Sequence, residues 1–566
     1  MAESSARRWW ALVAIAASVL VVGLDLTVLN LALPTIANDL HASTSDLQWF
    51  SDAYSLVLAA AMLPAGLLGD RFGRKKVLLI ALVLFGASSA ACAYAVNTGE
   101  LITARAVLGI GAAAIFPLSL SVIPVLFAPE ERQKAIAIMA SATFVSFPIG
   151  PIVGGYLLDH FWWGSVFLIN VPVVVLALIA VVVLLPESRS DQRRSVDILG
   201  VILSSAGLAG MTYGFIKAGQ NGWTNGAALA TIAAGVVVLG LFVAWERLLT
   251  RRYLSAEAGS GAGSPRGGGI RPLIELQLFR SASFTWGTAL STLVSFAMFG
   301  ILFAMPQYFQ EVRGVNAMGS GLRLLPMIGG MVVGMISSTR LASPRRAVAP
   351  QVAAVPGTAT AASRAPLASV KGLVTIGFTL MAATLAVGAM TKTSSGTGFA
   401  AAWFALFGLG LGLAMPQTMN AALSALSAER SGSGSALISA MRQVGATIGV
   451  AVLGTVLDSV YRGHLAVTHL PAATAAVARS SVVAGVQVAH VLHSAALLDS
   501  ARSAFVQGMD TMLWVCGGIA LASAILALIF LPRRSEGIPA PESPAPESTV
   551  PAAAGASDSE RAQLEV

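Results

Sequence analysis

Long apolar runs restrict this chain more than any other feature of its sequence. About fourteen stretches of roughly 20 apolar residues, the length that an α-helix needs to cross a bilayer, follow one another along the 566 residues. Charged residues make up 11% of the chain and hydrophobic residues 56%, whereas about 25% of a soluble domain is charged. A fold in water cannot hide that much apolar surface, so we expect an all-α membrane protein surrounded largely by lipid.

The predicted spans form two groups of six with two further helices between them. They cover residues 11–33, 47–68, 77–96, 101–123, 135–158, 165–185, 196–218, 227–247, 284–308, 317–340, 372–390, 398–425, 432–458 and 509–531. Transporters are often built from two related halves. The predicted parts are a six-helix bundle (1–195), two inserted helices (196–247), a cytoplasmic linker (248–283), a second six-helix bundle (284–531) with a cytoplasmic linker (342–370) and an external loop (459–508), and a disordered cytoplasmic tail (532–566).

Basic residues predict the orientation of these helices. Lys and Arg cluster in alternate loops, and cytoplasmic loops are the ones rich in Lys and Arg. The clusters are Arg7/Arg8, Arg71/Arg74/Lys75/Lys76, Arg132/Lys134, Arg189/Arg193/Arg194, Arg251/Arg252, Arg345/Arg346 and Arg533/Arg534. We therefore expect an even number of spans with both termini cytoplasmic, in a bacterial cytoplasmic (inner) membrane. The net charge of +8 follows from these clusters, so no nucleic-acid partner is expected.

The sequence gives no sign of a cofactor, a metal or an enzymatic centre. Its two cysteines, Cys92 and Cys516, lie inside apolar runs, which argues against a disulfide or a metal site. No Gly-x-x-x-x-Gly-Lys-[Ser/Thr] phosphate loop occurs, so we expect an ion gradient rather than ATP as the energy source. Neither His-Glu-x-x-His nor Gly-x-Ser-x-Gly occurs, which disfavours an intramembrane enzyme.

Two charged residues inside predicted spans, Asp25 and Arg105, stand out. A charge in the membrane interior costs roughly 3 kcal/mol or more, so Asp25 should face a cavity or a partner. Counting about 1.5 Å of rise per residue places both residues in the outer half of the membrane, where an ion pair is possible. Burial favours the neutral form of a carboxyl group and a nearby cation favours the charged form, so we predict that this pair couples transport to protons.

Two further motifs have glycines where helices would turn or touch. The loop from Gly66 to Lys76 joins the second and third spans, and Gly73 permits a sharp bend there. In the fifth span, glycine allows close helix packing and proline removes a backbone hydrogen bond. That second motif is Gly150-Pro151-x-x-Gly154-Gly155.

The loop resembles the signature loop of the major facilitator superfamily, with Gly69 where alanine is more usual. Further strings resemble motifs of the same superfamily. Leu101 to Gly111 resembles the helix-four motif, and the Gly150-Pro151 string resembles the helix-five antiporter motif, with Ser146 replacing its usual leading glycine. Asp25 to Pro34 resembles the helix-one motif of the fourteen-helix drug:proton antiporters of the QacA/EmrB type. Gln48-Trp49, Ala53-Tyr54 and Arg442-Gln443-Val444-Gly445 are also typical of that group.

This resemblance implies a major facilitator fold of two six-helix bundles plus two extra central helices. It assigns a gating role to the loop residues Gly69, Asp70, Arg71, Gly73 and Arg74. It also gives the Gly150-Pro151 motif a role in sealing the cavity during antiport.

A set of polar, aromatic and sulfur-containing residues makes up the predicted substrate cavity. For Asp52, contact with substrate or proton and a position in interfacial water are both open, and for Arg442 we favour bracing of a helix. The predicted cavity residues are Asn30, Asp52, Tyr54, Phe116, Phe147, Met305, Trp403, Met415 and Arg442.

The function that these features predict is proton-coupled export. An anionic site attracts cations and an apolar cavity binds lipophiles. We therefore expect a monomeric multidrug antiporter that exchanges protons for lipophilic, often cationic compounds by alternating access. A dedicated exporter of a single metabolite or antibiotic with the same fold is the alternative.

Overall fold

The computed structural model describes residues 2–127, 129–185, 187, 197–259, 272, 276–342, 369–426 and 431–532, and all regular elements in these ranges are helical. The helices of the first half are α1 (Ala2–Leu40), α2 (Thr44–Phe72), α3 (Arg74–Ala93), α4 (Thr98–Leu126), α5 (Pro129–His160), α6 (Ser165–Leu168), α7 (Asn170–Leu184), α8 (Ile198–Asn221) and α9 (Gly226–Gly259). Those of the second half are η1 (Leu276–Arg280), α10 (Ala282–Gln307), η2 (Tyr308–Val312), α11 (Ala317–Ala342), α12 (Val370–Gly388), α13 (Thr397–Leu423), α14 (Ser431–His464), α15 (Ala472–Ser480), α16 (Val482–Val491) and α17 (Ala495–Phe530).

Within the described ranges, 12 helices are long and apolar enough to cross a membrane. They match every predicted span except 47–68 and 135–158, which fall in α2 and α5. These two helices have 29 and 32 residues, more than the about 20 residues that a crossing requires. The chain is therefore a multi-pass membrane protein, and the count of fourteen spans stays a prediction.

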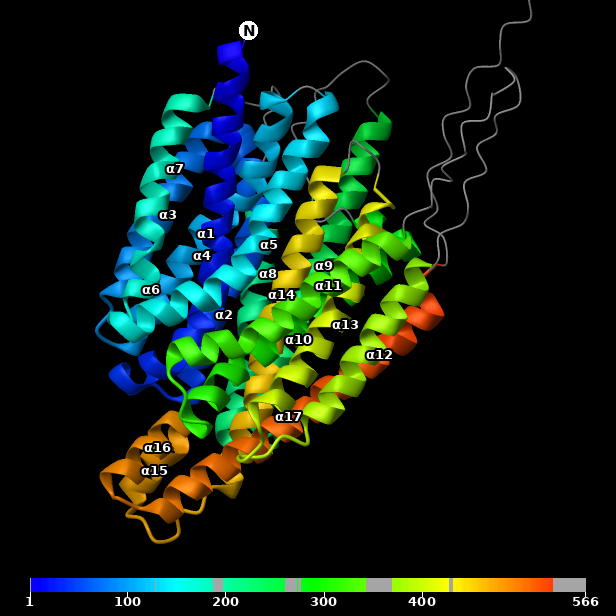
Figure 1. The fold of residues 1–566 in the computed structure, drawn as a ribbon. Coiled ribbons are helices and arrows are strands. Elements are labelled where there is room, and N and C mark those ends of the chain that lie inside the picture. Colours follow the sequence, from blue (N-terminus) through cyan, green and yellow to red (C-terminus); the bar gives the residue numbers. More distant parts are fainter. Residues whose placement is uncertain are drawn as a thin grey trace, which may run out of the picture.

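The helices form two bundles that lie side by side (Figure 1). In the first bundle, α1 packs on α5 and α7, and α4 packs on α2 and α3. In the second, α13 packs on α11 and α12, and α14 packs on α10 and α17. The bundles meet where α2 packs on α14 and α5 packs on α11, so these four helices make the seam.

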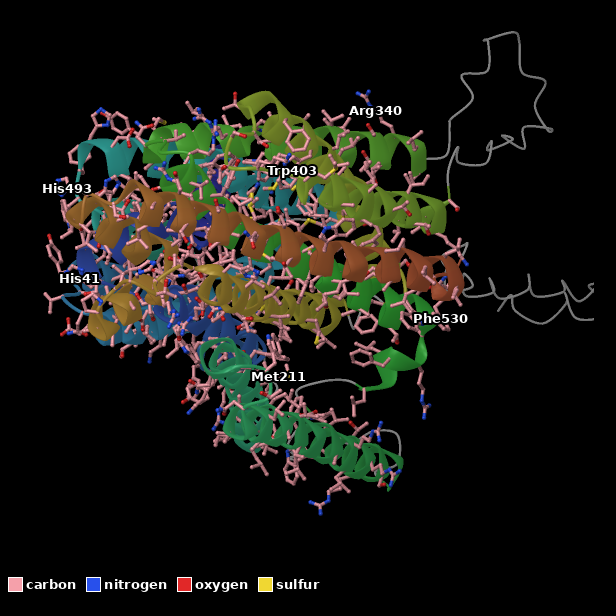
Figure 2. All side chains as sticks on the ribbon, turned by 90° about the horizontal axis from the view of Figure 1, so that it is seen from below. His41, Met211, Arg340, Trp403, His493 and Phe530 are labelled. Carbon is pink, nitrogen blue, oxygen red and sulfur yellow. The ribbon has the colours of Figure 1, made fainter. Side chains whose placement is uncertain are left out.

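The two ends of the bundle are distinguished by the labelled residues of Figure 2. His41, which follows α1, lies at the same end as His493, whereas Arg340 and Phe530 lie at the opposite end (Figure 2). We call these the His41 end and the Phe530 end. Because α1 runs toward His41, its first turns with Arg7 lie at the Phe530 end.

Polar caps explain where several helices begin. Ser43 accepts a hydrogen bond from the Asp46 backbone N–H, and the Asp46 carboxylate accepts one from the Ser43 N–H at 2.9 Å, which completes a capping box before α2. Asn97 caps α4 in a similar way through the Glu100 N–H at 2.8 Å. Ser43 and Asn97 therefore mark in the sequence where α2 and α4 begin.

The α8–α9 pair is central in the sequence but lies at the side of the molecule (Figure 2, Met211). The two helices pack closely on each other, and a Cβ added at Gly235 would lie 2.6 Å from the Met211 backbone nitrogen. Among the described residues, only α8 of this pair makes extensive contact with the bundles, through α14 and α2. The pair therefore borders the seam from outside.

Two predicted loops differ from the structure. Residues 248–259 of the predicted linker continue α9, and the predicted external loop 459–508 contains the end of α14, the helices α15 and α16, and the beginning of α17. α17 starts at Ala495, capped by Ser494, and buries Leu497, Ala501 and Phe505 on one face. A search for uniformly apolar segments misses such amphipathic turns. The linker segment 343–368 and the tail from 533 onward lie outside the described residues.

Gly111 of α4 lies where this helix packs closely on α3. A Cβ at this position would lie 2.9 Å from the Phe85 nitrogen and 3.0 Å from the Ala81 oxygen, so a larger side chain must push two backbones apart. We expect Gly111→Val to lower the free energy of unfolding by about 1–3 kcal/mol, measured as a lower melting temperature in detergent. Gly240→Val in α9 is the matched control, because nothing lies within 4 Å of its added Cβ. Equal melting temperatures for the two variants would contradict the packing argument.

Candidate functional site

A buried ion pair joins α1 and α4. Arg105 Nη1 donates to Asp25 Oδ2 at 2.6 Å, and both side chains are 1% exposed. Breaking a buried pair by removing one partner typically costs about 3–5 kcal/mol. The contact that the sequence predicted is therefore present, while its role in proton coupling stays a prediction.

Two groups on α2 hold the Arg105 guanidinium in place. Its Nε donates to the Phe50 carbonyl at 2.9 Å, and the guanidinium carbon lies 4.4 Å from the centre of the Tyr54 ring. A cation over an aromatic face gains up to about 2 kcal/mol when it is desolvated. Arg105 thus connects α1, α2 and α4 through a single charged group.

A small cavity between the bundles borders this ion pair. It has a volume of about 10 Å³, and its lining includes Asn30, Ser51, Ser55, Arg105, Phe299 and Val450. Such a volume holds about one water molecule. Residues from α1, α2 and α4 thus face residues from α10 and α14 across a space that is nearly closed in this conformation.

Most of the predicted cavity residues lie elsewhere in this conformation. Asn30 lines the cavity, and Tyr54 contacts Arg105, but the lining does not include Phe116, Met305, Trp403 or Met415. Trp403 instead stacks on Phe404, with ring centroids 4.2 Å apart. Met305 is 1% exposed within the packed core. These apolar side chains pack between helices instead of lining the cavity. The side chain of Phe147 lies outside the described residues.

Asp52 is fully buried, which excludes the interpretation as an interfacial residue in water. Its residue is 0% exposed, and in the described part of the chain neither carboxylate oxygen has a hydrogen-bond partner. It does not line the small cavity. A buried carboxylate without a donor is costly, so a proton or a polar ligand at Asp52 would be stabilised.

Polar side chains that the sequence flagged only as family motifs cross the seam. Gln48 donates to the Ala451 carbonyl at 3.2 Å, and Gln443 donates to the Ser55 hydroxyl at 3.3 Å. Arg442 is half-buried, and its Nε donates to the Ser295 hydroxyl on α10 at 3.4 Å. Arg442 therefore braces two helices of the second bundle, and the two glutamines join α2 to α14.

The Gly150-Pro151 motif lies where α5 meets both α1 and α11. A Cβ at Gly154 would lie 2.8 Å from Val28 Cγ1, and one at Gly155 would lie 2.7 Å from Met318 Cα. A Cβ added at Gly321 of α11 would in turn collide with the Pro151 carbonyl oxygen. Only glycine permits this approach, so the motif is part of a close-packed seam between the bundles.

Hydrogen bonds between the bundles gather toward the His41 end. Asn316 Nδ2 donates to Asp159 Oδ2 at 2.6 Å, and Gln310 Nε2 donates to the Leu31 carbonyl at 2.9 Å. The Thr44 hydroxyl donates to the Ser480 carbonyl at 3.1 Å. These contacts close the His41 end in this conformation.

The segment with α15 and α16 covers this closed end (Figure 1). Tyr461, on α14, donates its hydroxyl proton toward the Ala478 and Ser481 carbonyls, at 2.9 Å and 3.1 Å. Across the seam, Gln487 donates to Asn38 of α1. The segment therefore contacts both bundles.

Comparison with known proteins places the chain in a family. The model of the Major Facilitator Superfamily matches residues 15–450. This chain belongs to the major facilitator superfamily. The resemblance seen in its motifs is confirmed, and the two bundles described above are the halves of a major facilitator fold. In the described part of this transporter, no group of three or more His, Cys, Asp or Glu residues is placed to hold a metal ion.

Several curated relatives of this major facilitator protein cover nearly its whole length. The tetracenomycin C resistance and export protein of Streptomyces glaucescens is 32% identical over 96% of this chain and 95% of the relative. The multidrug efflux pump LfrA of Mycolicibacterium smegmatis is 33% identical over 92% of this chain and 95% of the relative. Solved structures share the fold at lower identity. A bacterial homologue of the human lysosomal transporter Spinster has a TM-score of 0.61 at 15% identity, over 92% of this chain and 96% of that one.

In this major facilitator protein, the signature loop is fixed to neighbouring helix ends. Gly73 has a φ of 107° and separates α2 from α3, which confirms the predicted bend. Arg74 Nη1 donates to the Ser121 carbonyl at 2.9 Å, and Lys75 Nζ donates to the Leu185 carbonyl at 2.7 Å. Arg71 is exposed.

Gly69 also packs closely at this loop. A Cβ at Gly69 would collide with the end of Leu118 of α4. The side chain of Asp70 lies outside the described residues. The gating role of the loop stays a prediction.

The ion pair predicts strong coupling between Asp25 and Arg105. We expect Asp25→Asn and Arg105→Gln each to lower the free energy of unfolding by about 3–5 kcal/mol, because each leaves a polar group buried without its partner. The double variant should lose less than the sum, by about 1 kcal/mol or more. Melting in detergent measures all four proteins. Strictly additive losses would mean that the two side chains do not interact.

Proposed function

We propose that this protein is a proton-coupled exporter of lipophilic, predominantly cationic compounds. The observation that carries the proposal is the buried Asp25–Arg105 pair at the wall of a cavity between two bundles. A carboxyl group in this position can exchange a proton for the charge of a guanidinium or of a bound cation. The named activities of the relatives, antibiotic export and multidrug efflux, support the same assignment.

The coupling step follows from the contacts of Arg105. A proton that binds Asp25 removes the negative charge that holds Arg105 Nη1 at 2.6 Å. Arg105 then keeps the Phe50 carbonyl and the Tyr54 ring, both on α2, and the more distant Phe167 ring of α6. Protonation therefore loosens α1 from α4 and α2, and deprotonation restores the pair. A cationic substrate and a proton compete for the same carboxylate, so binding of one favours release of the other.

The orientation in the membrane follows from the positive-inside rule. Arg7, Arg74 and Lys75 belong to the Phe530 end, where α1 begins and where α2 meets α3. Lys and Arg are enriched in cytoplasmic loops. We infer that the Phe530 end faces the cytoplasm of a bacterial cell, with the N-terminal segment there, and that the His41 end faces outward.

Alternating access then requires the contacts of the His41 end to break. In the present conformation Asp159–Asn316, Leu31–Gln310 and Thr44–Ser480 join the bundles on that side. Rocking of one bundle against the other would separate these pairs and open the cavity outward. The cavity of about 10 Å³ must expand to hold a drug-sized ligand, for which about 300 Å³ or more is usual.

Export of a single compound is the second candidate function. The relative from Streptomyces glaucescens is named for tetracenomycin C alone. Both candidates use the same fold and the same ion pair. A panel of chemically unrelated substrates distinguishes them, because a dedicated exporter moves one scaffold and a multidrug exporter moves several.

Proton movement in reconstituted vesicles tests the proposal directly. With an imposed pH gradient and a pH-sensitive dye, we expect lipophilic cations to dissipate the gradient through the wild-type protein. Asp25→Asn should abolish this response, because its side chain cannot carry the proton. Asp499→Asn, an exposed acid on α17, is the matched control and should behave as wild type. If Asp25→Asn dissipated the pH gradient as fully as wild type, Asp25 would have no role in proton coupling.

A reversible cross-link tests whether the His41 end must open. We expect Asp159→Cys/Asn316→Cys to transport normally when reduced and to stop when oxidised, since the disulfide would join α5 to the residue just before α11. The native Cys92 and Cys516 are buried, so they should not interfere. Asp159→Cys alone is the control and should be insensitive to oxidation. Undiminished transport by the fully cross-linked protein would show that this end stays closed throughout the cycle.

A further inference from the structure

A second cavity lies between α11 and α13, away from the seam ion pair. It has a volume of about 280 Å³, and its wall includes Phe309, Leu322, Arg323, Pro326, Thr397 and Ala401. Leu322 and Arg323 lie two turns into α11, and Thr397 begins α13. Apart from Arg323, the lining residues are uncharged. The cavity therefore combines apolar walls with a single positive charge.

Arg323 has unused hydrogen-bonding capacity. Its Nη1 donates to the Gly319 carbonyl at 2.9 Å, and among the described residues it has no acidic partner. A guanidinium carries five N–H donors in a planar fork that matches a phosphate or a carboxylate. Four donors are left for a ligand or water, so an anion in this cavity would meet a partner of opposite charge.

The depth of Arg323 matches the head-group region of a bilayer. α11 has 26 residues, so it is about 39 Å long and exceeds a hydrocarbon core of about 30 Å by a few ångströms at each end. Arg323 lies six residues after Ala317, and its side chain turns back to the carbonyl of Gly319. This snorkelling direction brings the charge to the level of lipid head groups.

An apolar strip leads from the cavity toward the middle of the membrane. Leu322 is 49% exposed and Val333, three turns further along the same face, is 57% exposed. Phe399 and Leu406 on α13 are exposed as well. A free anion would use the charge alone, whereas a lipid would use both the charge and this strip.

We propose that this cavity binds a membrane phospholipid with a net negative head group. The phosphodiester pairs with Arg323, and the acyl chains lie against Leu322, Pro326 and the exposed strip of α11 that reaches Val333. The beginning of α13 supports the same sign of charge, because its cap residue Gly396 supplies no side-chain hydrogen bond to the first turn and a helix N-terminus favours anions.

The site lies within one turn of the closed seam. Asn316, which donates to Asp159 across the seam, also accepts a hydrogen bond from the Gly319 N–H at 3.0 Å. The carbonyl of that same Gly319 accepts from Arg323. A lipid that binds Arg323 therefore acts on the turn of α11 that closes the His41 end.

Native mass spectrometry of the full chain with defined lipids tests the site. We expect wild type to retain phosphatidylglycerol in preference to phosphatidylethanolamine, and Arg323→Gln to lose that preference by about tenfold. Arg323→Lys should keep part of it, since the charge remains without the planar fork. Arg340→Gln, an exposed arginine at the other end of α11, is the matched control and should retain the wild-type preference.

Two further measurements keep the proposal open to refutation. Ala401→Trp should fill the cavity and reduce lipid retention while Arg323 is intact, so it decides the matter if Arg323→Gln folds poorly. Glycerol phosphate should fail to displace phosphatidylglycerol, because it cannot use the apolar strip. Unchanged retention in both Arg323→Gln and Ala401→Trp, or displacement by glycerol phosphate, would overturn the lipid site.

Discussion

The guanidinium of Arg105 connects three helices that the lipid alone would not hold together. Lipid tails are as apolar as leucine, so helices inside a membrane gain little from burying apolar side chains against one another. Arg105 instead binds Asp25 of α1 at 2.6 Å and Phe50 of α2 at 2.9 Å from its own position on α4. The first bundle is thereby fixed by charge at its centre and by glycine packing at its edges, where Gly109 and Gly111 of α4 face α2 and α3. Any change in the charge of Asp25 therefore alters the contacts that hold α1, α2 and α4 together.

The Asp25–Arg105 pair was predictable because a charged side chain in a membrane needs a cavity or a partner. Simple counting of residues along two helices put Asp25 and Arg105 at the same depth, and the cost of an unpaired charge made them partners. Gly73 was predictable for a comparable reason, since a φ of 107° is costly for other residues. In contrast, Trp403, Met305 and Met415 were predicted to line the cavity, and in this conformation they do not. Apolar side chains carry no depth or partner signal, and in the structure helix packing takes them up.

The seam shows a second limit of sequence reasoning. Gln48 and Gln443 were recognised as parts of family motifs, but nothing in a single sequence shows that both cross between α2 and α14. The hydrogen bond from Gln48 to the Ala451 carbonyl joins residues about 400 positions apart in the sequence. Only the antiparallel packing of α2 and α14 brings these two residues together. The region around α15 and α16 was predicted as an external loop for another reason, because it is amphipathic and a search for continuous apolar length does not give the bounds of its helices.

The arrangement of α1 explains how a proton could act at a distance in the proposed antiporter. Asp25 and Leu31 lie six residues apart on this helix, or about 9 Å, and the Leu31 carbonyl accepts a hydrogen bond from Gln310 of the second bundle. Between them, Thr27 and Val28 pack against Gly150 and Gly154 of α5. A helix is stiff over two turns, so loosening it at Asp25 shifts its contacts with α5 and with the second bundle together. The close fit at those glycines leaves no room for α1 to move alone, and a small displacement at the carboxylate is therefore carried to the bonds that close the His41 end.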